Sequence, residues 1–450
     1  MKSARGSVVP AIGKTFRKRD IAMINDPSEP ILPQVIRGRF WFPEHPTLIL
    51  TGELRISAPH QYDLFLDLPH YGLTNPGYWE SRIGKEIPII LGVTVESQPL
   101  TCSDCQIYSS STSYGAPRSV SWHQLKIWAH CCIFGAHIED VSCARFSKFS
   151  GYFTGFNLWA SAYDGELFPD DEEDKKRTGT KRRDEIKGFG AITILEAGAE
   201  AVSIGNVSRR TQIRYWKPSF EPSANVSLDQ LLDIVRDFQR LLCLFQGMAV
   251  GFDEIRARLA LPSDPTRTKQ REDVEIMVMM TGYKVPTKRG PHDQDLVPLS
   301  CAADRWPEIV ANWFNWSEAR AAVLNLYFAV LFGKSLFQEH KFLFLAQAVE
   351  GYHRCRYDRD IPFVRRVEEV ATAHAHILSF FINDIPKFCE EVRDIRNEFT
   401  HPGPGTPPPR SNVQLLWRQL RSLLEICFFH DLGLGAQVLE RVAKRHFDRP

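Results

Sequence analysis

Short hydrophobic runs in the first half of the chain predict β-strands. Branched and aromatic residues gather in stretches separated by Pro, Gly and Asn, and no long segment with a helical period interrupts them before about residue 225. This pattern favours a β-sandwich or a barrel-like domain. The predicted strands cover residues 36–42, 48–56, 62–68, 87–95, 119–134, 145–159, 191–197 and 212–216.

The pattern changes to a helical period at Ser227. Ser227 and Gln230 form a capping-box signature, and apolar residues then recur at helical spacing. A proline-rich connector follows, and beyond it the short breaks between helical segments are typical of an antiparallel bundle. The sequence therefore predicts an α+β protein, with a β-rich domain followed by an all-α bundle. The predicted helices cover residues 227–247, 317–333, 336–352, 362–381, 385–400, 413–431 and 437–446. The predicted parts are a tail (1–29), the β-rich domain (30–225), the linking helix with its connector (226–300) and the helical domain (301–450).

The charge balance limits what the surface as a whole can bind. The chain has 450 residues, with 55 Lys and Arg against 54 Asp and Glu, which gives a net charge of +1. This excludes a surface devoted entirely to nucleic acid or membrane, although a local basic patch remains open. No apolar run is long enough for a signal peptide or an anchor, so no membrane partner is expected. The ten cysteines are then expected to be reduced thiols in a cytoplasmic protein.

The most informative segment is Arg396-Asn397-Glu-Phe-Thr-His401, at the end of a predicted helix that Pro402 and a Pro/Gly loop terminate. Within a helix Asn397 and His401 face the same way, whereas Arg396 lies about 140° from His401. A frayed last turn would be needed to bring Arg396 and His401 onto one phosphate. The spacing alone is weak evidence, but only here does asparagine follow the arginine late in an amphipathic helix. The same spacing recurs at Arg55/His60, Arg118/His123 and Arg441/His446.

This motif, within an all-helical C-terminal region, resembles that of the HEPN superfamily. The arrangement is most similar to the ApeA-like HEPN group, in which a Glu-x-x-His/Arg pattern precedes the Arg-Asn helix, here as Glu350-Gly-Tyr-His353-Arg354. The first domain also resembles the ApeA N-terminal domain, through Gly38-Arg-Phe-Trp-Phe-Pro43 and then Gly52-Glu-Leu54. Together these similarities extend from about residue 35 to residue 445.

The resemblance implies a metal-independent endoribonuclease in defence against phage, often acting by shutting down the infected host. The substrate would be tRNA or mRNA, cleaved when the ribose 2′-hydroxyl attacks the adjacent phosphate. His401 would transfer a proton, Arg396 would hold the phosphoryl oxygens and Asn397 would orient the histidine. Paired HEPN modules line one cleft, so a homodimer is implied. The N-terminal domain would sense a phage-derived trigger, and neither a cofactor nor a metal is expected.

Three further residues are candidates for supporting the site or binding RNA: Glu350, His353 and Arg393. Glu350 could instead pair with an arginine of the bundle, and His353 could be an ordinary surface histidine. Because the charges of the helical domain nearly balance, any RNA groove must be a local patch. Its candidate cations are Arg365, Arg366, Arg393, Arg410 and Arg418.

Other interpretations stay open beside this one. Cys102-Ser-Asp-Cys105 has the spacing of half a zinc site, but the later cysteines lack the spacing of a second pair, so no metal is predicted. The charged loop at residues 164–187 could contact nucleic acid or a partner, or be a solvated hairpin loop. One rival function is a non-catalytic HEPN module that binds RNA or nucleotide and dimerises, beside a ligand-sensing β domain. The other is a carbohydrate- or peptide-binding β domain on a helical oligomerisation stalk.

Overall fold

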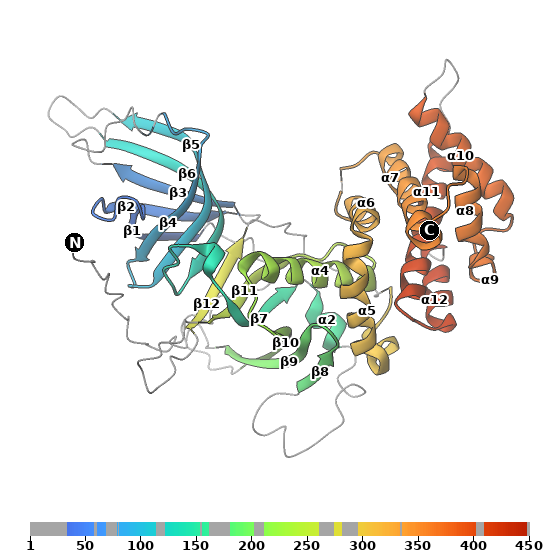
Figure 1. The fold of residues 1–450 in the computed structure, drawn as a ribbon, viewed down its shortest axis with the longest axis horizontal. Coiled ribbons are helices and arrows are strands. Elements are labelled where there is room, and N and C mark those ends of the chain that lie inside the picture. Colours follow the sequence, from blue (N-terminus) through green and yellow to red (C-terminus); the bar gives the residue numbers. More distant parts are fainter. Residues whose placement is uncertain are drawn as a thin grey trace.

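The computed structural model of the chain describes residues 34–57, 61–68, 79, 81–113, 122–153, 155–161, 181–201, 211–260, 274–280, 296–333, 335–401 and 409–447. The strands are β1 (Gln34–Trp41), β2 (Leu50–Ser57), β3 (Gln61–Leu68), β4 (Glu86–Thr94), β5 (Pro99–Ser113), β6 (Trp122–Phe134), β7 (Phe146–Phe153), β8 (Lys181–Ile186), β9 (Gly190–Ala201), β10 (Thr211–Pro222), β11 (Phe252–Leu259) and β12 (Val274–Met280). The α-helices are α2 (Phe156–Ser161), α4 (Leu228–Gln246), α5 (Trp306–Ala319), α6 (Ala321–Phe332), α7 (Gln338–Tyr357), α8 (Phe363–Thr372), α9 (Ala375–Leu378), α10 (Ile385–Thr400), α11 (Arg410–Asp431) and α12 (Ala436–Phe447). Figure 1 shows β1–β6 at one end of the molecule, α7–α12 at the other, and α4 and α5 between them.

The first six strands close into a barrel. They follow the order β3-β2-β1-β4-β5-β6, and β3 pairs again with β6 to complete the ring. Burial alternates along β2 and β3 because one side of each strand faces the interior and the other faces solvent. Apolar side chains such as Phe40, Leu54 and Ile127 fill the interior and are fully buried. The barrel-like domain predicted from the sequence is therefore confirmed, and its interior is a packed core.

Two glycines allow the barrel strands to approach one another closely. Gly38 on β1 and Gly52 on β2 face each other across the ladder. A Cβ atom at Gly38 would lie 2.5 Å from the carbonyl oxygen of Val93, and one at Gly52 would lie 2.3 Å from that of Phe65. Any larger residue at these positions would push a neighbouring strand away, which explains the glycines in the N-terminal sequence pattern.

The sheet continues beyond the barrel as β12, β11, β7, β10, β9 and β8. β12 pairs with β6 and β11 pairs with β7, so these two strands join the barrel to the outer part of the sheet. Both lie in the segment interpreted from the sequence as a proline-rich connector, where no strand was predicted. β5 and β8 were not predicted either. β8 is formed by the last part of the charged loop at 164–187, and residues 164–180 lie outside the described residues.

A second core joins the outer strands to the helices. It extends without interruption from β7 through α4 to α5–α12. At its centre the rings of Trp159, Phe245 and Trp306 pack against one another, with centroids 5.6–6.0 Å apart. Arg421 of α11 also donates a hydrogen bond of 2.8 Å to the carbonyl oxygen of Gly247, the C-cap of α4. The helical region is therefore joined to the sheet through a shared core.

The helices follow the sequence pattern with a few interruptions. The capping box at the start of α4 is present, because Ser227 Oγ accepts from the N–H of Gln230 and the Gln230 side chain accepts from the N–H of Ser227. The helix predicted at 317–333 is divided between α5 and α6, and the one predicted at 362–381 is divided between α8 and α9. Among the described residues, no helix combines the length and the apolar character needed to cross a membrane.

Candidate active site on helices α7, α8 and α10

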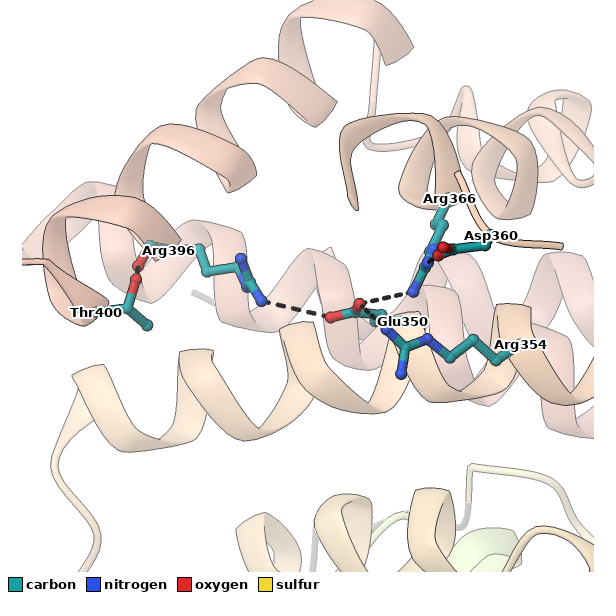
Figure 2. Close-up of polar contacts among 6 residues, drawn as sticks. All are labelled: Glu350, Arg354, Asp360, Arg366, Arg396 and Thr400. Atoms are coloured by element: carbon teal, nitrogen blue, oxygen red, sulfur yellow. Dashed lines mark hydrogen bonds and ion pairs between the residues drawn. The ribbon is translucent and has the colours of Figure 1, made fainter. Parts of the chain in front are cut away.

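Glu350 on α7 is the acid at the centre of the site. Its Oε1 accepts hydrogen bonds from Arg354, one turn along the same helix, at 2.9 Å and from Arg366 of α8 at 2.7 Å. Its Oε2 lies 3.4 Å from Nη2 of Arg396 on α10. Figure 2 shows these arginines converging on the carboxylate from different sides. The Glu350 side chain is only 18% exposed, so its negative charge needs these cations nearby.

Arg366 is the innermost of the three arginines. Its side chain is 4% exposed and lies 2.6 Å from Asp360 in addition to its contact with Glu350. The interpretation of Arg366 as an RNA-groove residue was wrong, because its guanidinium is committed to two carboxylates and shielded from solvent. The neighbouring Arg365 points to the surface instead, where it pairs with Glu368 at 2.5 Å.

Arg396 is held by the protein through few of its donors. A guanidinium has five N–H groups, and here one nitrogen, Nη2, faces Glu350. The guanidinium carbon also lies 4.5 Å from the centroid of the Phe363 ring, a cation–π contact. Within the described part of the chain, Nε and Nη1 of Arg396 have no hydrogen-bond partner, and 29% of the side chain is exposed. Donors of Arg396 therefore remain available to a ligand.

Helix α10 begins and ends at identifiable caps. Asp384 accepts a hydrogen bond from the N–H of Lys387 at 3.0 Å, and His401 is the C-cap, whose N–H donates to the carbonyl oxygen of Asn397 at 2.8 Å. Asn397 and His401, which the helical spacing places on the same side of the helix, are both exposed. Arg396, in contrast, extends toward Glu350 and away from the Thr400 end of the helix (Figure 2). The described structure thus places Arg396 and His401 at the same helix end without direct contact between their side chains.

His353 and Arg393 occupy different environments. His353 is fully buried, and its Nε2 lies 2.8 Å from Oε2 of Glu369 on α8, an oxygen that also accepts from Arg359 at 2.8 Å. The interpretation of His353 as a surface histidine was therefore wrong. Arg393 is partly exposed and pairs only with the adjacent Asp394, at 2.7 Å, among the residues that the structure describes. His353 is thus buried in the bundle beside the Glu350 cluster, whereas Arg393 is accessible to a ligand.

The two cysteines that have the spacing of half a zinc site belong to the barrel wall. Cys102 and Cys105 are buried on β5, and Cys132 lies opposite Cys102 on β6, with the two sulfurs 3.8 Å apart. Burial raises the pKa of the nearby Cys131 thiol to about 12, which disfavours the thiolate that a metal would require. Across the described ranges, no three His, Cys, Asp or Glu side chains gather as metal ligands.

The protein belongs to a class with two parts, in which a β-barrel with additional strands precedes a helical domain that contains the Glu350 cluster. The model of ApeA N-terminal domain 1 matches residues 35–313, from β1 into α5, and the model of the Apea-like HEPN domain matches residues 343–437, from α7 into α12. The first match covers more than half of the chain, so the chain belongs to the ApeA-like HEPN family. No curated protein and no solved structure matches it.

Family membership confirms the resemblance inferred from the sequence and the α+β fold class. An HEPN domain of the ApeA type associates the chain with anti-phage defence. HEPN domains are in general ribonucleases that bind RNA and dimerise. The HEPN match includes both Glu350 and the motif from Arg396 to His401. The domain boundaries and the roles of individual residues remain predictions.

Proposed function

We propose that the chain is a metal-independent endoribonuclease of anti-phage defence that acts by abortive infection. One observation carries the proposal: the Apea-like HEPN match contains an arginine of the motif held by a central acid, with an exposed histidine at the end of the same helix. In the proposed reaction the ribose 2′-hydroxyl attacks the adjacent phosphorus. The bond from phosphorus to the 5′-oxygen then breaks, leaving a 2′,3′-cyclic phosphate and a 5′-hydroxyl.

His401 is suited to the proton transfer. An imidazole can accept and donate a proton near neutral pH, provided that it can reach the substrate. His401 is exposed at the end of α10, and among the described residues its ring has no hydrogen-bond partner. Asn397 lies one turn earlier on the same exposed side, where its amide could hydrogen-bond the imidazole or the RNA backbone.

Arg396 is suited to bind the phosphate. Charge builds on the phosphoryl oxygens in the transition state, and a fixed guanidinium with available donors stabilises it. Glu350 and Phe363 fix the Arg396 side chain, whereas its Nε and Nη1 have no described partner. Three arginines contact Glu350, and one of them also contacts Asp360, so the cluster has more positive than negative charges and attracts phosphate.

Two further features belong to the proposal. A homodimer through the helical domain would place a second motif at the same cleft and supply a second proton-transfer group, since Arg396 and His401 of one chain make no direct contact. The barrel domain would sense a phage-derived trigger. Because apolar side chains fill its interior, that trigger would bind on the outside of the barrel. The substrate would be tRNA or mRNA.

Cleavage of a total tRNA and mRNA pool by the purified chain in EDTA tests the proposal. Wild type is expected to leave 2′,3′-cyclic phosphate ends, and His401→Ala is expected to cut at least about a hundredfold more slowly because proton transfer is lost. His376→Ala is the matched control, since His376 is also an exposed histidine but lies on α9, away from the motif. The control should cleave like wild type.

Two results would contradict the proposal in different ways. Equal cleavage by wild type and His401→Ala would assign the chemistry to other residues. RNA binding by both, with cleavage by neither in buffer or in extract of infected cells, would favour the non-catalytic binding and dimerisation module. Arg396→Lys tests whether the forked donors of Arg396 are needed for cleavage, because lysine keeps the positive charge but lacks these donors.

A further inference from the structure

Phe337 is the most exposed aromatic side chain that the structure describes. It precedes the first turn of α7, and 72% of its surface is accessible. Its ring lies beside that of His340, with centroids 6.0 Å apart. A single exposed apolar ring is common at protein surfaces, so its meaning depends on the residues that surround it.

Packing contacts place Phe337 near the proposed catalytic histidine. The ring of Phe342, one turn into α7, lies 6.0 Å from that of Phe399, two residues before His401. Figure 2 likewise shows the Thr400 end of α10 lying over the first turns of α7. The start of α7, with Phe337 just before the helix and His340 in its first turn, is therefore at the same end of the bundle as His401.

The lysine and arginine side chains at this end of the bundle form no ion pair with a carboxylate of the described residues. Lys341 lies over the ring of Trp417 on α11, with Nζ 5.6 Å from the centroid, and forms no ion pair with any described residue. Arg410 and Arg418, both in the first half of α11, form none with the described residues either. Apart from Arg441, which contacts a cysteine sulfur, the other lysines and arginines from α5 onward whose side chains are described have an acidic partner.

The acids at this end do not cancel the positive charge. Glu339 and Glu398, on the same turns of α7 and α10, are partly buried, and they are outnumbered by Lys341, Arg410 and Arg418. The end of the bundle thus combines an open aromatic face with uncommitted cations. Proteins that bind single-stranded nucleic acid combine these same two features.

We propose that Phe337 and His340 form a stacking site for an unpaired base of single-stranded RNA, next to the phosphate that His401 would act on. Lys341 and Arg410 would contact the adjoining backbone. The proposal rests on the proposed ribonuclease function for its position and adds to it a subsite that holds one unpaired base beside the cleaved phosphate. A duplex would be excluded because its bases are paired and stacked and cannot cover the ring.

Binding can be measured separately from cleavage. The probe is a short fluorescein-labelled oligoadenylate, titrated by anisotropy with the full chain carrying His401→Ala. Adding Phe337→Ala or Phe337→Leu is expected to weaken binding by about fivefold to a hundredfold, the effect of losing one stacked base. Phe337→Trp, which keeps an aromatic face, should bind at least as tightly. A duplex of the same sequence should respond little to any of these changes.

Phe380→Ala is the matched control. Phe380 is also an exposed phenylalanine, 45% accessible, with the cation of Lys444 lying 4.5 Å from its ring centroid. It precedes α10, whereas His401 ends that helix, so it lies at the opposite end of the bundle. The control should bind the probe as tightly as the parent.

Three results would overturn the proposal. Unchanged binding by Phe337→Ala would show that no base stacks there. Equal binding by the Leu and Trp variants would indicate apolar contact rather than stacking. Loss of a dimer in Phe337→Ala, measured by light scattering at the same concentration, would assign the ring to a second copy of the chain. Weakened binding without cleavage by any wild-type preparation would leave the stacking site standing and count against the ribonuclease function.

Discussion

Two glutamates of the helical region, Glu350 and Glu425, are both held by arginine but in different surroundings. Glu425 on α11 is completely buried, where it accepts from Tyr327 at 2.6 Å and from Arg421 at 2.8 Å. Burial, and then the charge of Glu425, raises the pKa of Tyr327 well above its ordinary value, so its hydroxyl stays a donor. Glu350 is partly exposed, and three arginines contact its single negative charge.

The difference separates an acid that joins parts of the fold from one that holds a cation at the surface. Arg421 also donates to the carbonyl oxygen of Gly247, so the Glu425 network connects α11 to α6 and to the end of α4. At Glu350 the buried Arg366 provides the compensating charge, which allows Arg396 to remain partly open. Changes at Glu425 should therefore affect stability most, whereas changes at Glu350 should affect activity in addition to a smaller effect on stability.

The largest effect on stability is expected from Glu425→Gln. Removing this charge leaves the guanidinium of Arg421 buried without its anion, so we expect the free energy of unfolding to fall by about 3–5 kcal/mol. Denaturant unfolding of the full chain measures the loss.

A double variant tests whether this cost comes from the uncompensated charge. Arg421→Met with Glu425→Leu removes both charges and keeps the volume, so it should be more stable than either single variant. A double variant as unstable as the sum of the singles would show that the pair itself, rather than the stranded charge, supplies the stability.

A smaller effect on stability is expected from Glu350→Gln. Arg366 retains Asp360, and Arg354 and Arg396 reach solvent, so the free energy of unfolding should fall by about 1.5–3 kcal/mol, the range for a hydrogen bond to a charged group. RNA cleavage should fall by about tenfold or more, because Arg396 loses its anchor and a misplaced cation stabilises the phosphate poorly. Unfolding and cleavage are measured on the same preparations.

Glu368→Gln controls for the loss of a surface charge on α8. Glu368 pairs with the exposed Arg365, away from the Arg396 contact, so both measurements should stay close to wild type. If Glu350→Gln lowered stability and left cleavage unchanged, Glu350 would be a structural acid of the same kind as Glu425.

The sequence predicted local elements well and non-local pairing poorly. β2, β3 and α4 follow from alternation, helical period and a capping box, all of which lie within a few residues of one another. β11 and β12 form only because β7 and β6, far earlier in the chain, offer edges to pair with. β5 was missed because Cys102 and Cys105 lie in a run rich in serine and threonine, whereas in the barrel they act as small buried apolar residues.

The candidate site shows the same limit. Asn397 and His401 could be placed on one side of the helix because helical geometry fixes their relation. Arg366 and His353 could not be placed, since both are buried by the packing of α8 against α7. Local spacing says which residues share a face, but the partner helix determines whether that face meets solvent or core. Glu350 was suggested by the family pattern, and its three arginines became visible only in the folded chain.

The smallest expected effect is a loss of stability at low pH. It arises from a histidine that packs against α11, the helix that carries Glu425. His374, before α9, is buried and lies beside His430, with ring centroids 5.0 Å apart. Burial, followed by the charges of His430 and Arg356, lowers the pKa of His374 from 6.5 to about 4, although Asp431 opposes the shift. The unfolded chain therefore binds this proton at a higher pH than the folded chain. The stability due to neutral His374 is complete above pH 6.5 and is lost as the pH falls toward 4.

Unfolding of wild type at pH 7 and pH 5 should accordingly show a contribution on the order of 1 kcal/mol lost at the lower pH, after allowance for partial solvent screening. His374→Gln should lose less between the two pH values, because it has no proton to bind. His376→Gln, an exposed histidine two residues away, should retain the pH response of wild type. An identical response in all three proteins would mean that acid acts on the helical bundle through groups other than His374.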